Sequence, residues 1–74
     1  MNLENNLRKL RFEHAEMSQQ TLADLIGVTR MTIYSIEKGK YIPSTVLALK
    51  IARVFGKTVE EIFSLSEDDN TQKG

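Results

Sequence analysis

Residues 18–39 read SQQTLADLIGVTRMTIYSIEKG, and this stretch decides the fold. Ser18 is a residue type that caps helix N-termini, and apolar residues follow it at helical spacing up to Gly27. Glycine readily adopts the left-handed backbone that ends a helix, and Thr29 can cap a second helix that ends before Gly39. The stretch therefore predicts two helices joined by a tight turn, over residues 18–26 and 29–38.

Small and apolar side chains occur in this stretch where two packed helices need them. Ala23 falls where the two predicted helices cross, and a larger side chain there would push them apart. Val28, Ile33 and Ile36 are spaced to pack the second helix against the first. This pattern is typical of a helix-turn-helix, whose second helix is presented for insertion into the major groove of DNA.

The apolar residues outside this stretch also recur at helical spacing. They predict three further helices, over residues 3–14, 44–55 and 58–63. Pro43 disfavours helical backbone in the residue before it, so residues 40–42 are expected to form a loop. The expected fold class is therefore all-α, a compact domain of five helices.

The C-terminal part differs from the rest in pattern and in charge. Residues 62–65 alternate weakly between apolar and polar, which is compatible with a short strand after the last helix. Residues 67–74 are polar and acidic, and we expect a disordered tail there, after a helix-turn-helix domain over residues 1–66. The formal net charge is zero, but residues 1–59 hold nine Lys or Arg against five Asp or Glu, a surplus of +4. This basic body permits contact with phosphates.

Composition argues against several classes of protein. The 74 residues contain no cysteine and one histidine, His14, so disulfides, thiolate chemistry and a histidine-built metal site are excluded. No apolar run has the length of a signal peptide or a membrane span, so we expect a cytoplasmic protein without a membrane partner. A glycine-rich phosphate loop is absent and so small a helical domain has no deep pocket, which argues against an enzyme, a cofactor or a small-molecule substrate.

Four segments of the chain follow one known pattern: LRKLR (7–11), SQQTLADLIGVTR (18–30), TIYSIEKGKYIPS (32–44) and LALKIARVFGKTVEEIF (47–63). Together they resemble the Cro/cI-type (phage-repressor-like) family of helix-turn-helix transcriptional regulators. The resemblance implies a five-helix, lambda-repressor-like domain that binds double-stranded DNA.

The resemblance also implies roles for single positions. In the helix over 29–38 it implies contacts with base edges by Arg30, Met31 and Ser35. It implies phosphate contacts by Gln19, Thr32, Lys38 and Lys40, the last two together with the backbone amides just after Gly39. Arg11 and Glu37 correspond to a partly buried ion pair that ties the first helix to the third.

Side-chain chemistry bears on several of these positions. The guanidinium of Arg30 can donate two hydrogen bonds to guanine, one to O6 and one to N7. Alternatively, Arg30 is an exposed arginine that forms a local ion pair. Thr29 and Tyr34 are further candidates for phosphate contacts, with helix capping and shielding of the helix as their alternative roles. Met31 departs from the family, which usually has a polar residue there, so a thymine methyl is the base group that suits it. Tyr41 is expected to pack on its loop.

The predicted function depends on pairing of two chains. A two-fold dimer reads two half-sites about 34 Å apart, so we expect a homodimer. Phe63 and Leu65 lie beyond what a five-helix core needs. Together with the exposed side of the helix over 58–63 they are the expected dimer interface, with capping of the core as the alternative. We expect a sequence-specific transcriptional regulator, a homodimeric repressor that reads a two-fold symmetric operator through residues 29–38. The alternative function is a protein-interaction module or antitoxin-type component that uses the same helices against protein.

Overall fold

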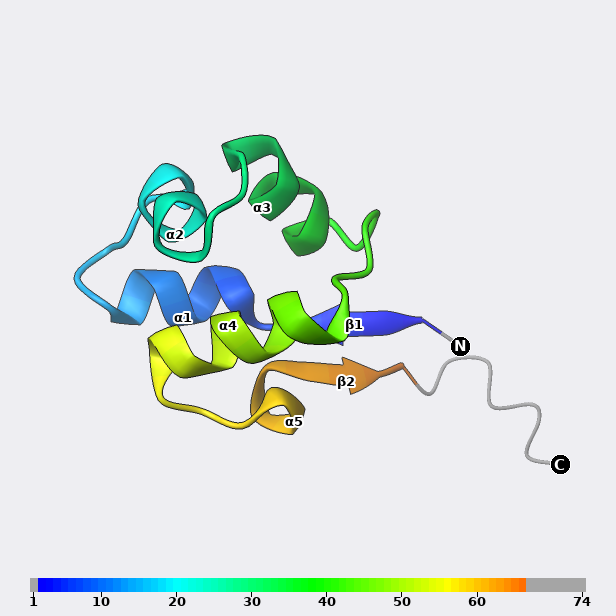
Figure 1. The fold of residues 1–74 in the computed structure, drawn as a ribbon. Helices are drawn as coiled ribbons and strands as arrows, with labels where there is room; N and C mark the ends of the chain where they lie inside the picture. Colours follow the sequence, from blue (N-terminus) through cyan, green and yellow to red (C-terminus); the bar gives the residue numbers. More distant parts are fainter. Residues whose placement is uncertain (1, 67–74) are drawn as a thin grey trace, which may run out of the picture.

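The structure is a computed structural model that describes residues 2–66, which form five helices and a two-stranded antiparallel sheet (Figure 1). The elements follow one another as β1 (Leu3–Asn5), α1 (Leu7–Glu13), α2 (Gln19–Ile26), α3 (Arg30–Glu37), α4 (Thr45–Phe55), α5 (Val59–Ile62) and β2 (Phe63–Leu65). The last four predicted helices are all present, with each end within one residue of its predicted position. The acidic tail predicted over residues 67–74 lies outside the described residues.

The helix caps predicted from the sequence are confirmed. Ser18, Thr29 and Ser44 have extended backbone, and each side chain accepts a hydrogen bond from the backbone amide three residues ahead. Gly27 and Gly56 end α2 and α4 in left-handed backbone, with φ of 78° and 64°. These local signals set the start of α3 and the turn that leads into it.

The predicted helix over residues 3–14 is wrong at its start, because Leu3–Asn5 form β1 and α1 begins only at Leu7. β1 pairs with β2 in antiparallel register, and Leu3 lies opposite Leu65. The spacing from Leu3 to Leu7 is compatible with a helix as well as with a strand. Residues 3–5 form a strand because they pair with β2, where Leu65 lies 62 residues after Leu3. The predicted strand after the last helix is confirmed as β2, and the sheet makes the fold mostly helical rather than all-α.

Asn5 fixes the junction between β1 and α1. Its Oδ1 accepts a hydrogen bond from the Leu7 amide at 3.0 Å, and its Nδ2 donates to the Ile36 carbonyl at 2.9 Å. An asparagine that bonds to nearby backbone in this way competes with helix formation. The N-terminal strand is thereby fastened to the C-terminal end of α3.

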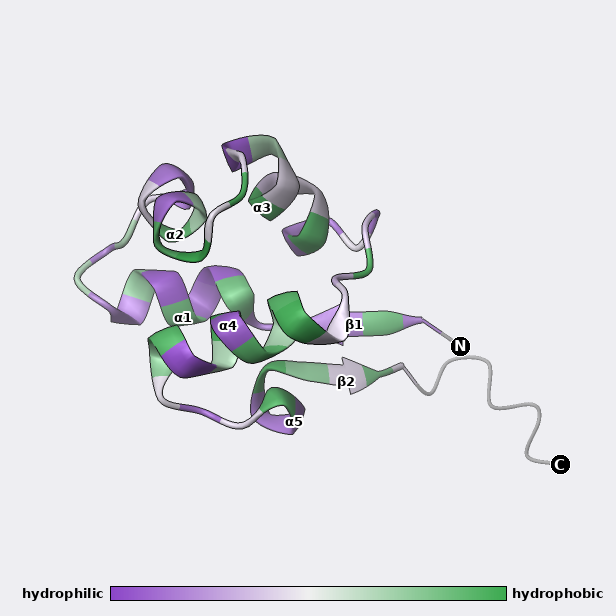
Figure 2. Cartoon of the chain, in the orientation of Figure 1, coloured by the Kyte–Doolittle hydropathy of each residue, from purple (hydrophilic) through white to green (hydrophobic). Residues whose placement is uncertain are grey.

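The core lies between the helices, and its largest fully buried side chains are Leu7, Leu22, Ile33, Ile36 and Ile51. They come from α1, α2, α3 and α4, so the four longer helices share one core. Figure 2 shows apolar and hydrophilic segments alternating along these helices, as expected where one face of each helix is buried. Within residues 2–66, no helix is long and apolar enough to cross a membrane.

The connector between α1 and α2 holds two residues in left-handed backbone, Ala15 with φ of 56° and Glu16 with φ of 54°. This conformation costs a residue with a side chain about 1–2 kcal/mol, and glycine avoids that cost. We therefore expect Ala15→Gly to raise the free energy of unfolding by about 0.5 kcal/mol, after glycine's larger entropy loss is subtracted. Urea denaturation followed by circular dichroism measures the change. Ala52→Gly inside α4 should lower stability instead, and a fall with both variants would contradict the prediction.

A capping box begins α5. The hydroxyl of Thr58 accepts from the Glu61 amide at 3.2 Å, and the Glu61 carboxylate accepts from the Thr58 amide at 2.8 Å. This second hydrogen bond, aided by the charge of Lys57, lowers the pKa of the Glu61 carboxyl below its ordinary value. Because the pKa is lower in the folded than in the unfolded state, the stabilisation is present above the unfolded pKa. It is lost as the pH falls through the folded pKa.

We expect Glu61→Gln to lower the melting temperature at about pH 7, and the effect to shrink as the pH falls through the lowered folded pKa of the Glu61 carboxyl. Thermal melts across this range measure the difference between parent and variant. Glu60→Gln, at the neighbouring exposed carboxylate, is the matched control. A difference for Glu61→Gln that stays constant with pH would show that the charge of Glu61 has no part in the cap.

Candidate nucleic-acid interface

The outward face of α3 carries the side chains that the resemblance assigns to DNA. Arg30 and Met31 are exposed and Ser35 is partly exposed. On the opposite face, Ile33 and Ile36 are 0% and 1% exposed. Figure 1 shows α3 at the outer edge of the molecule, with α1 and α4 on its inner side. The helix is therefore anchored by its apolar face and presents its polar face to solvent.

A shallow hollow of about 310 Å³ lies along this face of α3. Its lining residues are Thr29, Met31, Thr32, Ser35, Lys40 and Tyr41. The structure thus brings predicted base contacts and predicted phosphate contacts onto one surface with the loop that follows α3. Tyr41, which was expected to pack on its loop, is 47% exposed beside this hollow.

A chain of hydrogen bonds runs from Arg30 into the protein. Arg30 Nη1 donates to Gln19 Oε1 at 3.1 Å, and Gln19 Nε2 donates to Glu37 Oε1 at 3.1 Å. Glu37 accepts two more hydrogen bonds from Arg11, from Nε at 2.6 Å and from Nη2 at 3.0 Å. Side chains of α1, α2 and α3 are thus joined, and Gln19 links the exposed guanidinium of Arg30 to an anchored carboxylate.

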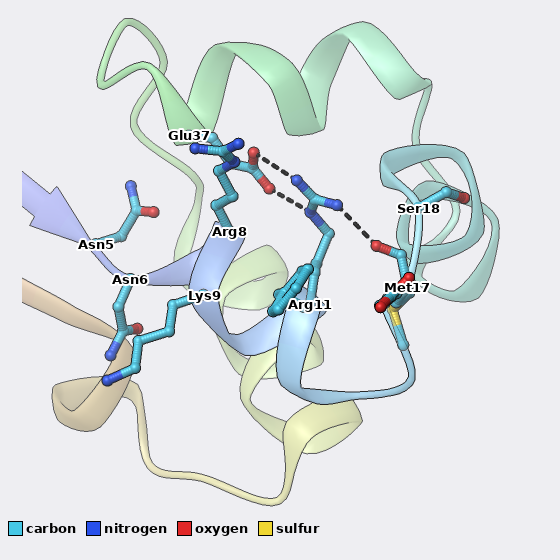
Figure 3. Close-up of a pocket in the computed structure, with 10 residues that line it drawn as sticks. Asn5, Asn6, Arg8, Lys9, Arg11, Met17, Ser18 and Glu37 are labelled. Carbon is cyan, nitrogen blue, oxygen red and sulfur yellow. Dashed lines mark hydrogen bonds and ion pairs between the residues drawn. The ribbon is translucent and has the colours of Figure 1, made fainter.

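The ion pair between Arg11 and Glu37 is the anchor of this chain. The two side chains are only 13% and 8% exposed. Arg11 Nη1 also donates to the Met17 carbonyl at 2.7 Å, so one guanidinium holds both α3 and the connector before α2 (Figure 3). A pair so little exposed to water is screened weakly, and each partner depends on the other for compensation of its charge.

Sequence reasoning missed a cationic hollow beside the ion pair of Arg11 and Glu37. Arg8 and Lys9 are exposed and line a hollow of about 720 Å³ together with Ser18 and Glu37. Figure 3 shows Arg8 extended toward Glu37, whereas Lys9 points away from it. The charged residues between the leucines of residues 7–11 signal an exposed cationic face, but their spacing does not say which element that face adjoins.

The corner after α3 is cationic. Lys38 and Lys40 flank Gly39 and are exposed, and Lys38 Nζ lies 5.6 Å from the centroid of the Tyr34 ring, a cation–π contact. The backbone amides of Lys40 and Tyr41 both donate to the Ser35 carbonyl, at 2.9 and 3.3 Å. These amides, which were expected to hold phosphate, are therefore engaged in ending α3. The corner offers phosphates its two ammonium groups.

The two residues expected at a dimer interface differ in exposure. Phe63 is 7% exposed and belongs to the core of its own chain, whereas Leu65 is 59% exposed. Phe63 also lines a shallow, mostly apolar hollow of about 220 Å³ with Leu3 and Leu49. Within residues 2–66, nothing covers Leu65 or this hollow.

Comparisons with known proteins agree with this geometry. A family model described as helix-turn-helix matches residues 3–62, which include all the helices of the structure. The HTH-type transcriptional regulator YgzD of Bacillus subtilis is 42% identical over 67 residues, which cover 90% of this chain and 100% of the relative. An HTH-type transcriptional regulator of Methanocaldococcus jannaschii is 46% identical over 67 residues, with the same shares covered. The control protein C.MunI of a Mycoplasma species is 42% identical over 60 residues, 81% of each chain.

Proposed function

Because the chain belongs to the Cro/cI-type helix-turn-helix family of DNA-binding transcriptional regulators, we propose that it reads double-stranded DNA sequence-specifically through α3. The observation that carries the proposal is Arg30, which is exposed in the first turn of α3 and hydrogen-bonded by Gln19. An arginine oriented before binding loses less freedom when its planar fork pairs with guanine O6 and N7. Met31 and Ser35 complete the proposed set of base contacts.

The proposed phosphate contacts surround these base contacts and are Gln19, Thr29, Thr32, Tyr34, Lys38 and Lys40. Their amide, hydroxyl and ammonium groups fix the register of α3 on the duplex without reading its sequence. The two lysines, which are exposed, supply the part of the affinity that falls as salt rises.

We propose further that two copies bind together as a homodimer and repress transcription. Occupancy of a two-fold operator that overlaps a promoter excludes other proteins from the same DNA and needs no second domain. Two copies of α3 would then enter the major groove about 34 Å apart.

Exposed apolar side chains support a dimer surface that includes β2 and α4. Leu65 lies on β2, and the loop before α4 and α4 itself carry Ile42, Val46 and Leu49, which are 70%, 64% and 56% exposed. Leu49 shares its hollow with Phe63, so the two parts of this surface meet there. A second copy would remove these apolar groups from water.

We expect Leu49→Glu to convert the homodimer into a folded monomer, because the new carboxylate would have to be buried against the second copy. Sedimentation velocity gives the oligomeric state, and circular dichroism shows that the helices are intact. The control is Lys50→Glu at the neighbouring exposed residue. This substitution reverses a charge and should leave the dimer in place. A parent chain that sediments as a monomer at high micromolar concentration would overturn the proposal.

Selection of bound duplexes from a random pool tests sequence-specific reading. The expected result is a two-fold symmetric motif, with binding that weakens steeply as salt rises. A chain that binds no duplex at any salt concentration would instead favour the protein-interaction module.

A further inference from the structure

The hollow along α3 differs in chemical character from the cationic surface around it. Its volume is about 310 Å³, and most of its lining is apolar. Met31 and Tyr41 are its two largest apolar side chains, one from α3 and one from the loop that follows, and they are 55% and 47% exposed. A mostly apolar hollow therefore lies within the surface that we propose to face DNA.

Hydrogen bonds hold the walls of this hollow in place. The backbone amides of Lys40 and Tyr41 both donate to the Ser35 carbonyl, so the loop is fastened to the end of α3. The hydroxyls of Thr29 and Thr32 share a hydrogen bond at 3.1 Å, and the Thr29 hydroxyl also accepts from the Thr32 amide. The hollow is therefore formed in the free chain, and several of its polar groups already have partners.

The position of the hollow decides which kind of group can fill it. A duplex seated on α3 covers the hollow, because proposed base contacts and proposed phosphate contacts both line it. The base edges in the major groove display hydrogen-bond donors and acceptors, and the only apolar group among them is the C5-methyl of thymine. 5-Methylcytosine carries the same methyl group at the same ring position. An apolar hollow in the reading surface therefore suits the C5-methyl of a pyrimidine.

We propose that Met31 and the ring of Tyr41 bind the C5-methyl of one pyrimidine in each half-site, so that the chain distinguishes methylated from unmethylated DNA at that position. The methionine thioether is polarisable and adapts its shape to an apolar partner, and the tyrosine ring offers an apolar face. Where the pyrimidine is a cytosine, its methylation becomes an input to regulation. This inference rests on the proposed function, because it assumes that α3 lies in the major groove.

The test uses the operator obtained by duplex selection, with changes confined to one half-site. Each thymine is replaced in turn by uracil, which removes the methyl group, and each cytosine in turn by 5-methylcytosine, which adds one. Fluorescence anisotropy measures the affinity of the parent chain for each labelled duplex. We expect one position at which the methyl group tightens binding about fourfold, the effect of burying one such group. A loss with uracil identifies the source as thymine, and a gain with 5-methylcytosine identifies it as methylated cytosine.

Substitutions at Met31 assign this effect to the hollow. Met31→Gln keeps the length of the side chain but makes it polar, so the affinities for the methylated and unmethylated duplexes should become equal. Met31→Leu should keep the fourfold ratio of the two affinities. Leu25→Gln is the matched control, because Leu25 is an apolar residue of α2 that is 58% exposed, and the ratio should persist there too.

Two results would overturn the inference while leaving sequence-specific binding intact. One is equal affinity with and without the methyl group at every position of the half-site. The other is a fourfold ratio that Met31→Gln leaves unchanged. A chain that binds no duplex would instead contradict the proposed function, and with it this inference.

Discussion

Glu37→Ala should lower the free energy of unfolding by about 3–5 kcal/mol, a large part of the stability of a domain this small. The substitution leaves the guanidinium of Arg11, whose side chain is 13% exposed, without its carboxylate. It also removes the acceptor of Gln19 Nε2. Three helices lose their common polar anchor, so the loss should far exceed that of an exposed ion pair.

Urea denaturation followed by circular dichroism measures this loss. Glu13→Ala, at an exposed carboxylate of α1, is the matched control and should change stability by less than about 0.5 kcal/mol. The double variant R11M/E37L should recover most of the stability, because apolar residues of similar size need no charge compensation. A loss below about 1 kcal/mol for Glu37→Ala would show that the pair is not an anchor.

Arg30→Ala should weaken binding to the selected operator by roughly fivefold to 150-fold per half-site, since a bidentate contact with guanine contributes about 1–3 kcal/mol of discrimination. The preference for guanine at one position of each half-site should be lost with it. Stability should change little because Arg30 is exposed. Repeating the duplex selection with the variant measures both effects.

Gln19→Ala tests the orientation of Arg30 through the guanine preference, because the variant also loses a proposed phosphate contact and the bond to Glu37, losses that lower affinity for any sequence. Without Gln19, the guanidinium keeps its charge but loses the hydrogen bond at 3.1 Å that directs it. We expect a smaller loss of operator affinity than for Arg30→Ala, together with a partial loss of the guanine preference. Equal affinity of parent and Arg30→Ala for the operator, with the guanine retained, would remove Arg30 from the base contacts.

The helices could be predicted because their signals are local. A capping hydroxyl such as Ser18 and a terminal glycine such as Gly27 act within one turn of the chain. β1 could not be predicted, because its leucine spacing also suits a helix and its partner strand is distant in the sequence. Local pattern reading detects neither that pairing nor the bond from Asn5 to α3.

The candidate site likewise has features that the sequence predicted and features that it did not. The resemblance named Arg30, Gln19 and the Arg11–Glu37 pair, and the structure shows these four side chains joined by hydrogen bonds. The amides after Gly39 donate to the Ser35 carbonyl because of the way α3 ends, and the sequence pattern does not predict that ending. The burial of Phe63 likewise follows from the sheet, which was missed on the β1 side.

The pairing of Leu3 with Leu65 has a consequence for synthesis of the chain on the ribosome. Residues 3–5 are translated long before residues 63–65, so the nascent chain can form its helices while its first strand still lacks a partner. That strand carries Asn5, which donates a hydrogen bond to the end of α3. We therefore expect the hydrogen bond from Asn5 to the Ile36 carbonyl to form only when the final strand emerges and closes the sheet.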